Sequence, residues 1–176
     1  MAWLTFLAGC SPPVGLTVAN KDPSYGGKLS RVLVIMALRQ EFLSASQNES
    51  LIRDFEIRQA LADSWAPLGV EVQVVDVNDR EATAQALAVF APTQALTLAL
   101  KHVSTRSFVV ATYSIDASVF DVPTGKRVWR ATIDFAEFMK GGHFRTGPLG
   151  TAITHQAEAN NLAKVLTEKF KAEALL

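Results

Sequence analysis

Cysteine is almost absent from this chain: Cys10 is the only one in 176 residues. A lone thiol forms no intrachain disulfide, so the fold has to rest on its apolar core. No run of about 18 apolar residues occurs either, which predicts that the given chain has no transmembrane helix. The 17 basic and 17 acidic residues cancel and form no block of one sign. We therefore expect no nucleic-acid partner, because phosphate-binding surfaces need an excess of positive charge.

Catalytic motifs are lacking as well. The sequence contains no Gly-x-Ser-x-Gly turn, no His-Glu-x-x-His and no P-loop. His102, His143 and His155 do not have the spacing of a metal site and have no cysteine partner, so they are predicted to be unrelated surface residues. The sequence predicts a protein that is not an enzyme and that binds no metal or cofactor.

Cys10 closes the tetrapeptide Leu7-Ala8-Gly9-Cys10 after an apolar stretch. This string resembles a bacterial lipobox, in which small residues give a peptidase and an acyl transferase access to the cysteine. Residues 1–9 are too short for a whole secretory signal and contain no Lys or Arg, which indicates that the true start lies upstream or that the segment was trimmed. A buried free cysteine is the alternative. By resemblance to known lipoproteins, Ser11 favours the outer membrane.

The residues after Cys10 are rich in Pro and Gly and show little periodicity. This composition predicts a lipidated cysteine and flexible tether over 10–29, ahead of a single globular domain over 30–176. The apolar fraction of 49% and the charged fraction of 19% are those of a folded protein of ordinary size.

Hydrophobic periodicity predicts the element order β-α-β-α-β-β-β-α. This order indicates an α/β fold, α+β-like in character, with a mixed sheet of about five strands, a long C-terminal hairpin and helices packed on the sheet. The expected strands lie over 31–37, 70–77 and 94–103, and the expected helices over about 47–66, 78–90 and from residue 151 onward.

The best local signal is the hairpin turn at Val122-Pro123-Thr124-Gly125-Lys126, in which Gly125 can take a left-handed conformation. A three-residue loop with Val122 opposite Lys126 would place the apolar and aromatic residues of both strands on one buried face, with Val119 opposite Trp129 and Tyr113 opposite Phe135. The other face would be polar and wet. It would carry the pairs Ser118–Arg130, Asp116–Thr132 and Ser114–Asp134.

Two readings of this polar face stay open. It could bind a partner through these six residues, or Asp116, Asp134 and Arg130 could form a general acid/base cluster. The glycine-rich loop over 141–150 is also ambiguous: its backbone amides with His143 and Arg145 could hold an anion or a glycan, or it could be a flexible surface loop or an oligomer contact.

The lipobox together with the hairpin reading Val-Phe-Asp-Val-Pro-Thr-Gly-Lys-Arg-Val-Trp (119–129) resembles small envelope lipoproteins of Gram-negative bacteria. Their domains include the N-terminal domain of the Tol–Pal translocation protein, the curli secretion lipoprotein, the Pel polysaccharide export lipoprotein and the penicillin-binding-protein activator lipoproteins. In element order the resemblance covers about residues 30–172.

The resemblance implies a non-enzymatic adaptor or assembly factor for secretion, polysaccharide export or peptidoglycan synthesis. It would be held at the periplasmic face of the outer membrane by lipid on Cys10, with envelope proteins or polysaccharide as partners and a homo-oligomer left open. The alternative is a small envelope enzyme, or a glycan- or anion-binding protein that uses the 141–150 loop and the polar hairpin face.

Overall fold

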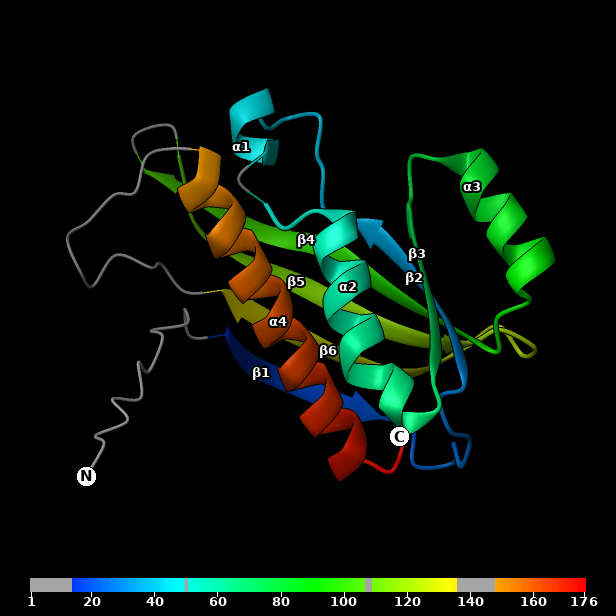
Figure 1. Cartoon of the computed structure of the whole chain (residues 1–176). Coiled ribbons are helices and arrows are strands. Elements are labelled where there is room, and N and C mark those ends of the chain that lie inside the picture. Colours follow the sequence, from blue (N-terminus) through cyan, green and yellow to red (C-terminus); the bar gives the residue numbers. More distant parts are fainter. Residues whose placement is uncertain (1–13, 50, 107–108, 136–147) are drawn as a thin grey trace, which may run out of the picture.

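The computed structural model describes residues 14–49, 51–106, 109–135 and 148–176. Its centre is a six-stranded sheet with the strand order β1-β6-β5-β4-β2-β3 (Figure 1). β2 is parallel to both of its neighbours, and the other pairs are antiparallel, so the sheet is mixed and the predicted α/β class is confirmed. The strands are β1 (Val14–Lys21), β2 (Arg31–Ala37), β3 (Glu71–Asp76), β4 (Gln94–Arg106), β5 (Val109–Asp121) and β6 (Lys126–Phe135).

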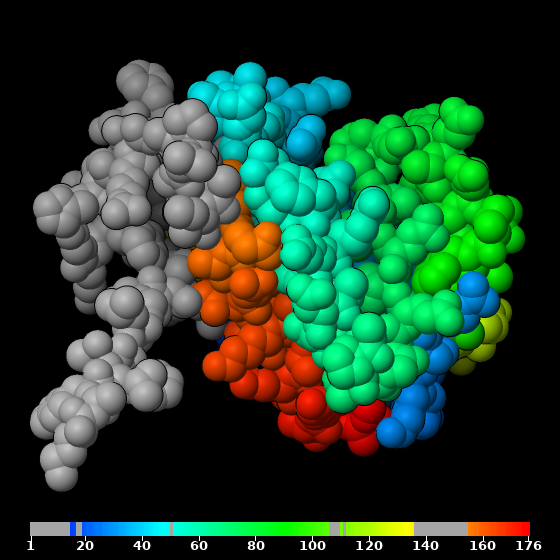
Figure 2. Space-filling view, viewed as in Figure 1, coloured from blue at the N-terminus to red at the C-terminus, as the bar shows by residue number. Residues whose placement is uncertain are grey.

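Two helices, α2 (Asp54–Trp65) and α4 (Pro148–Ala172), lie side by side across one face of the sheet (Figures 1 and 2). The other face is covered only over β2 and β3 in the described part of the chain, by α3 (Arg80–Gln85) and the π-helical turn η2 (Ala86–Phe90). A short helix, α1 (Ala45–Glu49), precedes α2, and a 3-10 turn, η1 (Ala66–Leu68), follows it. The face over β4, β5, β6 and β1 that lies opposite α2 and α4 carries no described helix.

β2 is apolar from residue 32 to residue 37, and both of its faces are covered. Val32, Val34 and Met36 point into the main core under α2 and α4, whereas Leu33 packs with Ala86 in a smaller cluster on the opposite face. Strands of parallel sheets that are buried on both sides show such continuous apolar runs. The predicted strand over 31–37 is therefore confirmed.

The predicted flexible tether is wrong over residues 14–21, which form the edge strand β1. β1 pairs antiparallel with β6, with Leu16 opposite Ile133 and Ala19 opposite Ala131. Leu16 and Ala19 pack against the main core. Pairing with β6 satisfies the backbone groups of a segment whose own sequence has little strand periodicity, which raises the number of strands from about five to six.

The single helix predicted over about 47–66 is also wrong, because the chain forms α1 and α2 separately. Leu51 and Ile52 lie between the two helices and are 1% and 3% exposed. Arg53, the N-cap of α2, has an extended backbone with φ −98° and ψ 158°, so α2 starts as a separate helix. The cap of α1 is reciprocal: the Ser44 N–H donates to Gln47 Oε1 at 2.9 Å, and the Gln47 N–H donates to Ser44 Oγ at 3.3 Å.

The predicted register of the long hairpin is confirmed over most of its length, with Val119 opposite Trp129 and Tyr113 opposite Phe135. The turn differs from the prediction. Asp121, not Val122, pairs with Lys126, so the loop has four residues, and the extra residue of the bulge lies further along β6. Gly125 has a φ of 66°, the left-handed conformation predicted for it.

Aromatic side chains join the hairpin to the helices. Phe170 of α4 lies between two indoles, with ring centroids 4.7 Å from Trp129 and 5.7 Å from Trp65. Trp65 also donates a hydrogen bond from Nε1 to Thr167 Oγ1 at 2.8 Å. These contacts fix α4 across the sheet and leave the opposite face of the hairpin as its polar side.

Candidate functional site

The polar face predicted for the hairpin exists in the structure. We define the open face as the side of β4, β5, β6 and β1 that lies opposite α2 and α4. The cross-strand pairs on it are the predicted ones, Ser118–Arg130, Asp116–Thr132 and Ser114–Asp134. Side chains opposite one another on antiparallel strands lie close enough to interact, so these six residues form one continuous patch.

Exposure is uneven along this patch. Arg130 is exposed, and Asp116, Ser118, Thr132 and Asp134 are half-buried. Ser114 is only 8% exposed, so the prediction that it lies on a wet surface is wrong for this residue. Among the six residues, Ser114 alone is buried.

Lys101 joins the patch from β4, where it follows Thr97 and Ala99 at the two-residue spacing of side chains on one face of a strand. A bulge in the pairing of β4 with β5 lies at this position. Leu100 is opposite Ile115 and His102 is opposite Ser114, which leaves Lys101 as the extra residue. Its Nζ lies 3.0 Å from Asp116 Oδ1 and donates a hydrogen bond to Thr132 Oγ1 at 2.9 Å. Thr132 in turn donates to Asp116 Oδ1 at 2.8 Å. The three side chains form a closed polar cluster across β4, β5 and β6.

This cluster determines the protonation of Asp116. Partial burial alone would raise the pKa of its carboxyl, but the hydrogen bonds from Lys101 and Thr132 and the nearby charges of Lys101 and Arg130 outweigh burial and lower it. Asp116 is therefore ionised near neutral pH and held by two partners. A carboxylate in this state makes a fixed recognition surface rather than a proton-transferring group.

A hollow of about 230 Å³ lies where β1 meets the start of β6. Arg127 and Arg130 line it from β6, and Asn20 and Asp22 from β1 and the residue that follows it. Val128 and Trp129 complete the lining. The sequence singled out Arg130 but not the others, because the contribution of β1 depends on pairing between distant segments.

A second polar cluster joins α2, α4 and β5 and was missed at the sequence level. Tyr113 of β5 donates a hydrogen bond to Glu158 Oε2 of α4 at 3.0 Å. Glu56 of α2 is 1% exposed, and its Oε1 receives the Arg53 guanidinium at 2.6 Å. His155 is 3% exposed, with Nδ1 3.8 Å from Glu56 Oε1. The predicted surface position of His155 is therefore wrong, since it lies on the inward face of α4; His102 is exposed as predicted.

Two pKa values in this buried cluster are raised. Burial raises the pKa of Glu158 from 4.5 to about 7; the Tyr113 hydrogen bond opposes this effect, and the neighbouring Glu56 adds to it. Burial, helped by the charge of Glu158, also raises the pKa of Tyr113 well above 10. Glu158 is half-buried and thus titrates near neutral pH. Such shifts occur at functional sites and in structural networks alike.

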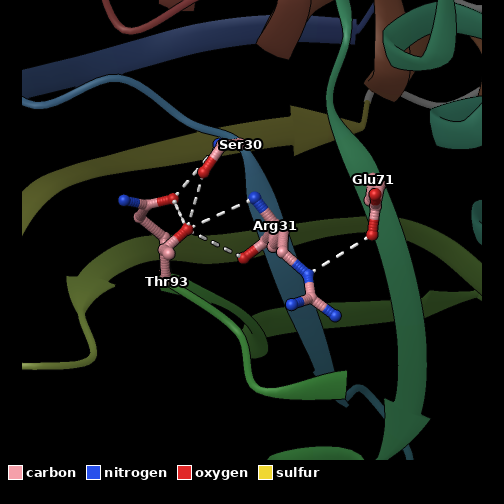
Figure 3. Close-up of polar contacts among 5 residues, drawn as sticks. Ser30, Arg31, Glu71 and Thr93 are labelled. Atoms are coloured by element: carbon pink, nitrogen blue, oxygen red, sulfur yellow. Dashed lines mark hydrogen bonds and ion pairs between the residues drawn. The ribbon is translucent and has the colours of Figure 1, made fainter.

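A third cluster ties the N-terminal ends of β2, β3 and β4 together (Figure 3). Thr93 Oγ1 lies 2.9 Å from Ser30 Oγ and accepts from the Arg31 N–H at 3.3 Å. Arg31 Nε lies 3.3 Å from Glu71 Oε2, and the Arg31 guanidinium lies 4.9 Å from the ring centroid of Phe90. Thr93 satisfies a backbone group at the end of β2, and the Arg31 side chain links β2 to β3 and η2, so this cluster is structural.

Cys10, His143 and Arg145 lie outside the described residues, as does most of the 141–150 loop. The described residues contain no group of three or more metal-ligating side chains. Among them, no helix is long and apolar enough to cross a bilayer.

Comparison with known proteins gives structural neighbours only. No family model matches the chain, and no curated protein matches it. The PelC dodecamer from Paraburkholderia phytofirmans is similar with a TM-score of 0.47 and 15% identity, over 86% of this chain and 96% of that one. The lipoprotein GNA1162 from Neisseria meningitidis has a TM-score of 0.43 and 16% identity, over 76% and 96% of the two chains.

A third neighbour is protein XCC0632 from Xanthomonas campestris, of family DUF330, with a TM-score of 0.42 and 10% identity over 92% of this chain and 97% of that one. Likenesses at this level carry no residue roles over to this chain.

Proposed function

We propose that this protein is a lipid-anchored adaptor or assembly factor of the Gram-negative envelope, held at the periplasmic face of the outer membrane through Cys10. It would serve secretion, polysaccharide export or peptidoglycan synthesis, and it would contact its partner through the open face. The anchor rests on the lipobox-like string ending at Cys10.

The observation that carries the adaptor role is the open face itself. Lys101 and Asp116 compensate each other across two strands and Thr132 bonds to both, so this part of the open face is polar and pre-ordered. Rims of protein–protein contacts have this character, and pre-ordered groups lower the entropic cost of association. Proton transfer would need a less firmly held carboxylate than Asp116.

The anchor is tested by mass spectrometry of the protein isolated from its native host. The expected result is an acylated Cys10 at the mature N-terminus, and a Cys10→Ser variant should leave the membrane fraction. An unmodified chain that begins before residue 10 and fractionates with the cytosol would overturn the anchor.

The open face is tested by a photo-crosslinking amino acid placed at Ser118. A matched position on the helix-covered side is Asp63, which is exposed on α2. Crosslinks to one envelope protein from position 118, absent from position 63 and lost on Arg130→Glu, would support the proposal. Equal crosslinking from both positions would contradict it.

A second function, the binding of a glycan or an anion, is favoured by the hollow beside Arg130 and is developed below.

An adaptor of this kind could work as a single chain or as a homo-oligomer. Light scattering decides it: a mass of one chain at all concentrations would exclude an oligomer as the working form.

A further inference from the structure

The bulge in β6 changes which way two arginines point. Phe120 is opposite Arg127 and Val119 is opposite Trp129, which leaves Val128 as the extra residue. Val128 and Trp129 are consecutive and yet are both buried, at 3% and 1% exposed. In a regular strand, residues three apart point to opposite faces, whereas a bulge lets two successive residues share one face.

Arg127 and Arg130 therefore lie on the same side of the sheet. Both are exposed, on either side of the buried pair Val128 and Trp129, and both line the same hollow. Arg127 is opposite Phe120, and Arg130 is opposite both Ser118 on β5 and Asn20 on β1, which places the pair on the open face. Without the bulge, one of the two guanidinium groups would have to point toward the core.

The guanidinium groups keep their hydrogen-bonding capacity. Within the described residues, neither Arg127 nor Arg130 donates a side-chain hydrogen bond. The Asp22 carboxylate on the opposite wall is held by the Ser24 N–H at 2.8 Å and by Ser24 Oγ at 2.7 Å, both at Oδ1. The second carboxylate oxygen of Asp22, Oδ2, and the side-chain amide oxygen of Asn20 remain as acceptors at the rim of the hollow. The hollow thus combines two forked cationic donors with two acceptors.

We propose that this hollow binds a uronate unit of an acidic polysaccharide, with its carboxylate between Arg127 and Arg130 and its hydroxyls donating to Asp22 and Asn20. Arginine forks match the geometry of a carboxylate. Asp22 would repel a bare phosphate or a dense polyanion but accepts hydrogen bonds from the hydroxyls of a sugar. The hollow is smaller than the pockets of about 300–1,000 Å³ that enclose whole ligands, which suits one unit of a longer chain.

This inference rests on the proposed function, because Arg130 belongs to the open face. The test is a titration of the full chain with trigalacturonate, followed by NMR of the arginine side-chain N–H signals. Maltotriose serves as the neutral probe and triglutamate as the acidic peptide. We expect saturable binding of trigalacturonate that Arg127→Gln and Arg130→Gln each weaken about tenfold, as for the loss of a charge-assisted hydrogen bond.

Arg80→Gln is the matched control, since it removes the same charge from an exposed position on α3 and should leave the affinity unchanged. Asp22→Asn should weaken the binding of trigalacturonate and strengthen the binding of triglutamate. Equal binding of triglutamate and trigalacturonate by the unaltered protein, or equal loss in Arg80→Gln, would overturn the assignment. Arg127 lies beside the turn and is exposed, so Arg127→Gln keeps the test valid if Arg130→Gln misfolds.

The two proposals fail separately. If trigalacturonate does not bind while position 118 still crosslinks to its envelope partner, only the proposed sugar site is contradicted. If Cys10 is unmodified and position 118 gives no crosslink, the proposed adaptor role is contradicted, whatever the result of the titration.

Discussion

Tyr113 and Glu158 join the hairpin to the last helix: the phenol donates a hydrogen bond to the carboxyl over 3.0 Å between residues 45 positions apart. The ring of Tyr113 stacks on Phe135 with centroids 4.4 Å apart, which holds the phenol in place. The carboxyl of Glu158 is therefore held where burial and Glu56 both oppose its charge.

Stability should fall as the pH rises through this site. The pKa of Glu158 is about 7 in the folded protein against 4.5 for a free glutamate, so folding favours the protonated form. The stabilisation is fully present below pH 4.5 and is lost as the pH rises to about 7. The side chain of the Glu158→Gln variant stays neutral at every pH. We expect its free energy of unfolding, relative to that of the unaltered protein, to rise by up to about 3 kcal/mol as the pH goes from about 4.5 to about 8, measured by urea unfolding. A constant difference across this range would contradict the prediction.

Tyr113→Phe provides the companion measurement. The hydrogen bond from Tyr113 lowers the pKa of Glu158, so its removal should move the midpoint of the pH-dependent stability to a higher pH. The variant keeps the ring that stacks on Phe135, which preserves the packing. An unchanged midpoint would show that the hydrogen bond does not affect the carboxyl.

The ion pair between Lys101 and Asp116 should matter little for stability. Their side chains are 48% and 49% exposed, so water screens the attraction. A double-mutant cycle with Lys101→Met and Asp116→Asn should give a coupling free energy of about 0.2–1 kcal/mol by urea unfolding. A coupling several times larger would mean that the cluster holds the strands together instead of presenting a surface.

Thr167 should be needed for the packing of Trp65. Thr167 Oγ1 accepts from Trp65 Nε1 at 2.8 Å, and Trp65 has no exposed surface. Thr167→Val leaves the indole N–H buried without an acceptor, at a cost of about 1–3 kcal/mol in the free energy of unfolding. Thr167→Ser keeps the hydroxyl and should retain most of the stability; equal losses in the two variants would point to packing rather than the hydrogen bond.

Gly125 should tolerate no side chain without a cost. Its φ of 66° is strained for residues that carry a Cβ, although a Cβ at this position would meet no other atom within 4 Å. Gly125→Ala should lower the free energy of unfolding by about 1 kcal/mol, and Gly125→Asn by less. Gly26→Ala is the control, because that site is equally open and has no positive φ. Its thermal midpoint should stay close to that of the unaltered protein.

The local sequence pattern was sufficient to predict the features that depend on residues close together in the sequence. The alternation around the turn predicted which residues of the hairpin face the core, and the apolar run over 31–37 predicted β2, because side-chain period and burial are coupled within one strand. The same alternation predicted the polar pairs on the open face, including Asp116 with Thr132.

Tertiary structure decided the rest. Residues 14–21 became a strand only by pairing with β6, and His155 and Glu56 came together only because α4 lies against α2. Lys101 meets Asp116 and Thr132 only because β4, β5 and β6 pair side by side. The bulge at Val128 depends on how β6 fits its partner and the core, and it places Arg127 on the same face as Arg130. The sequence by itself determined which faces are apolar; only the packing of distant segments, which sets register, burial and desolvation, decided which polar groups meet.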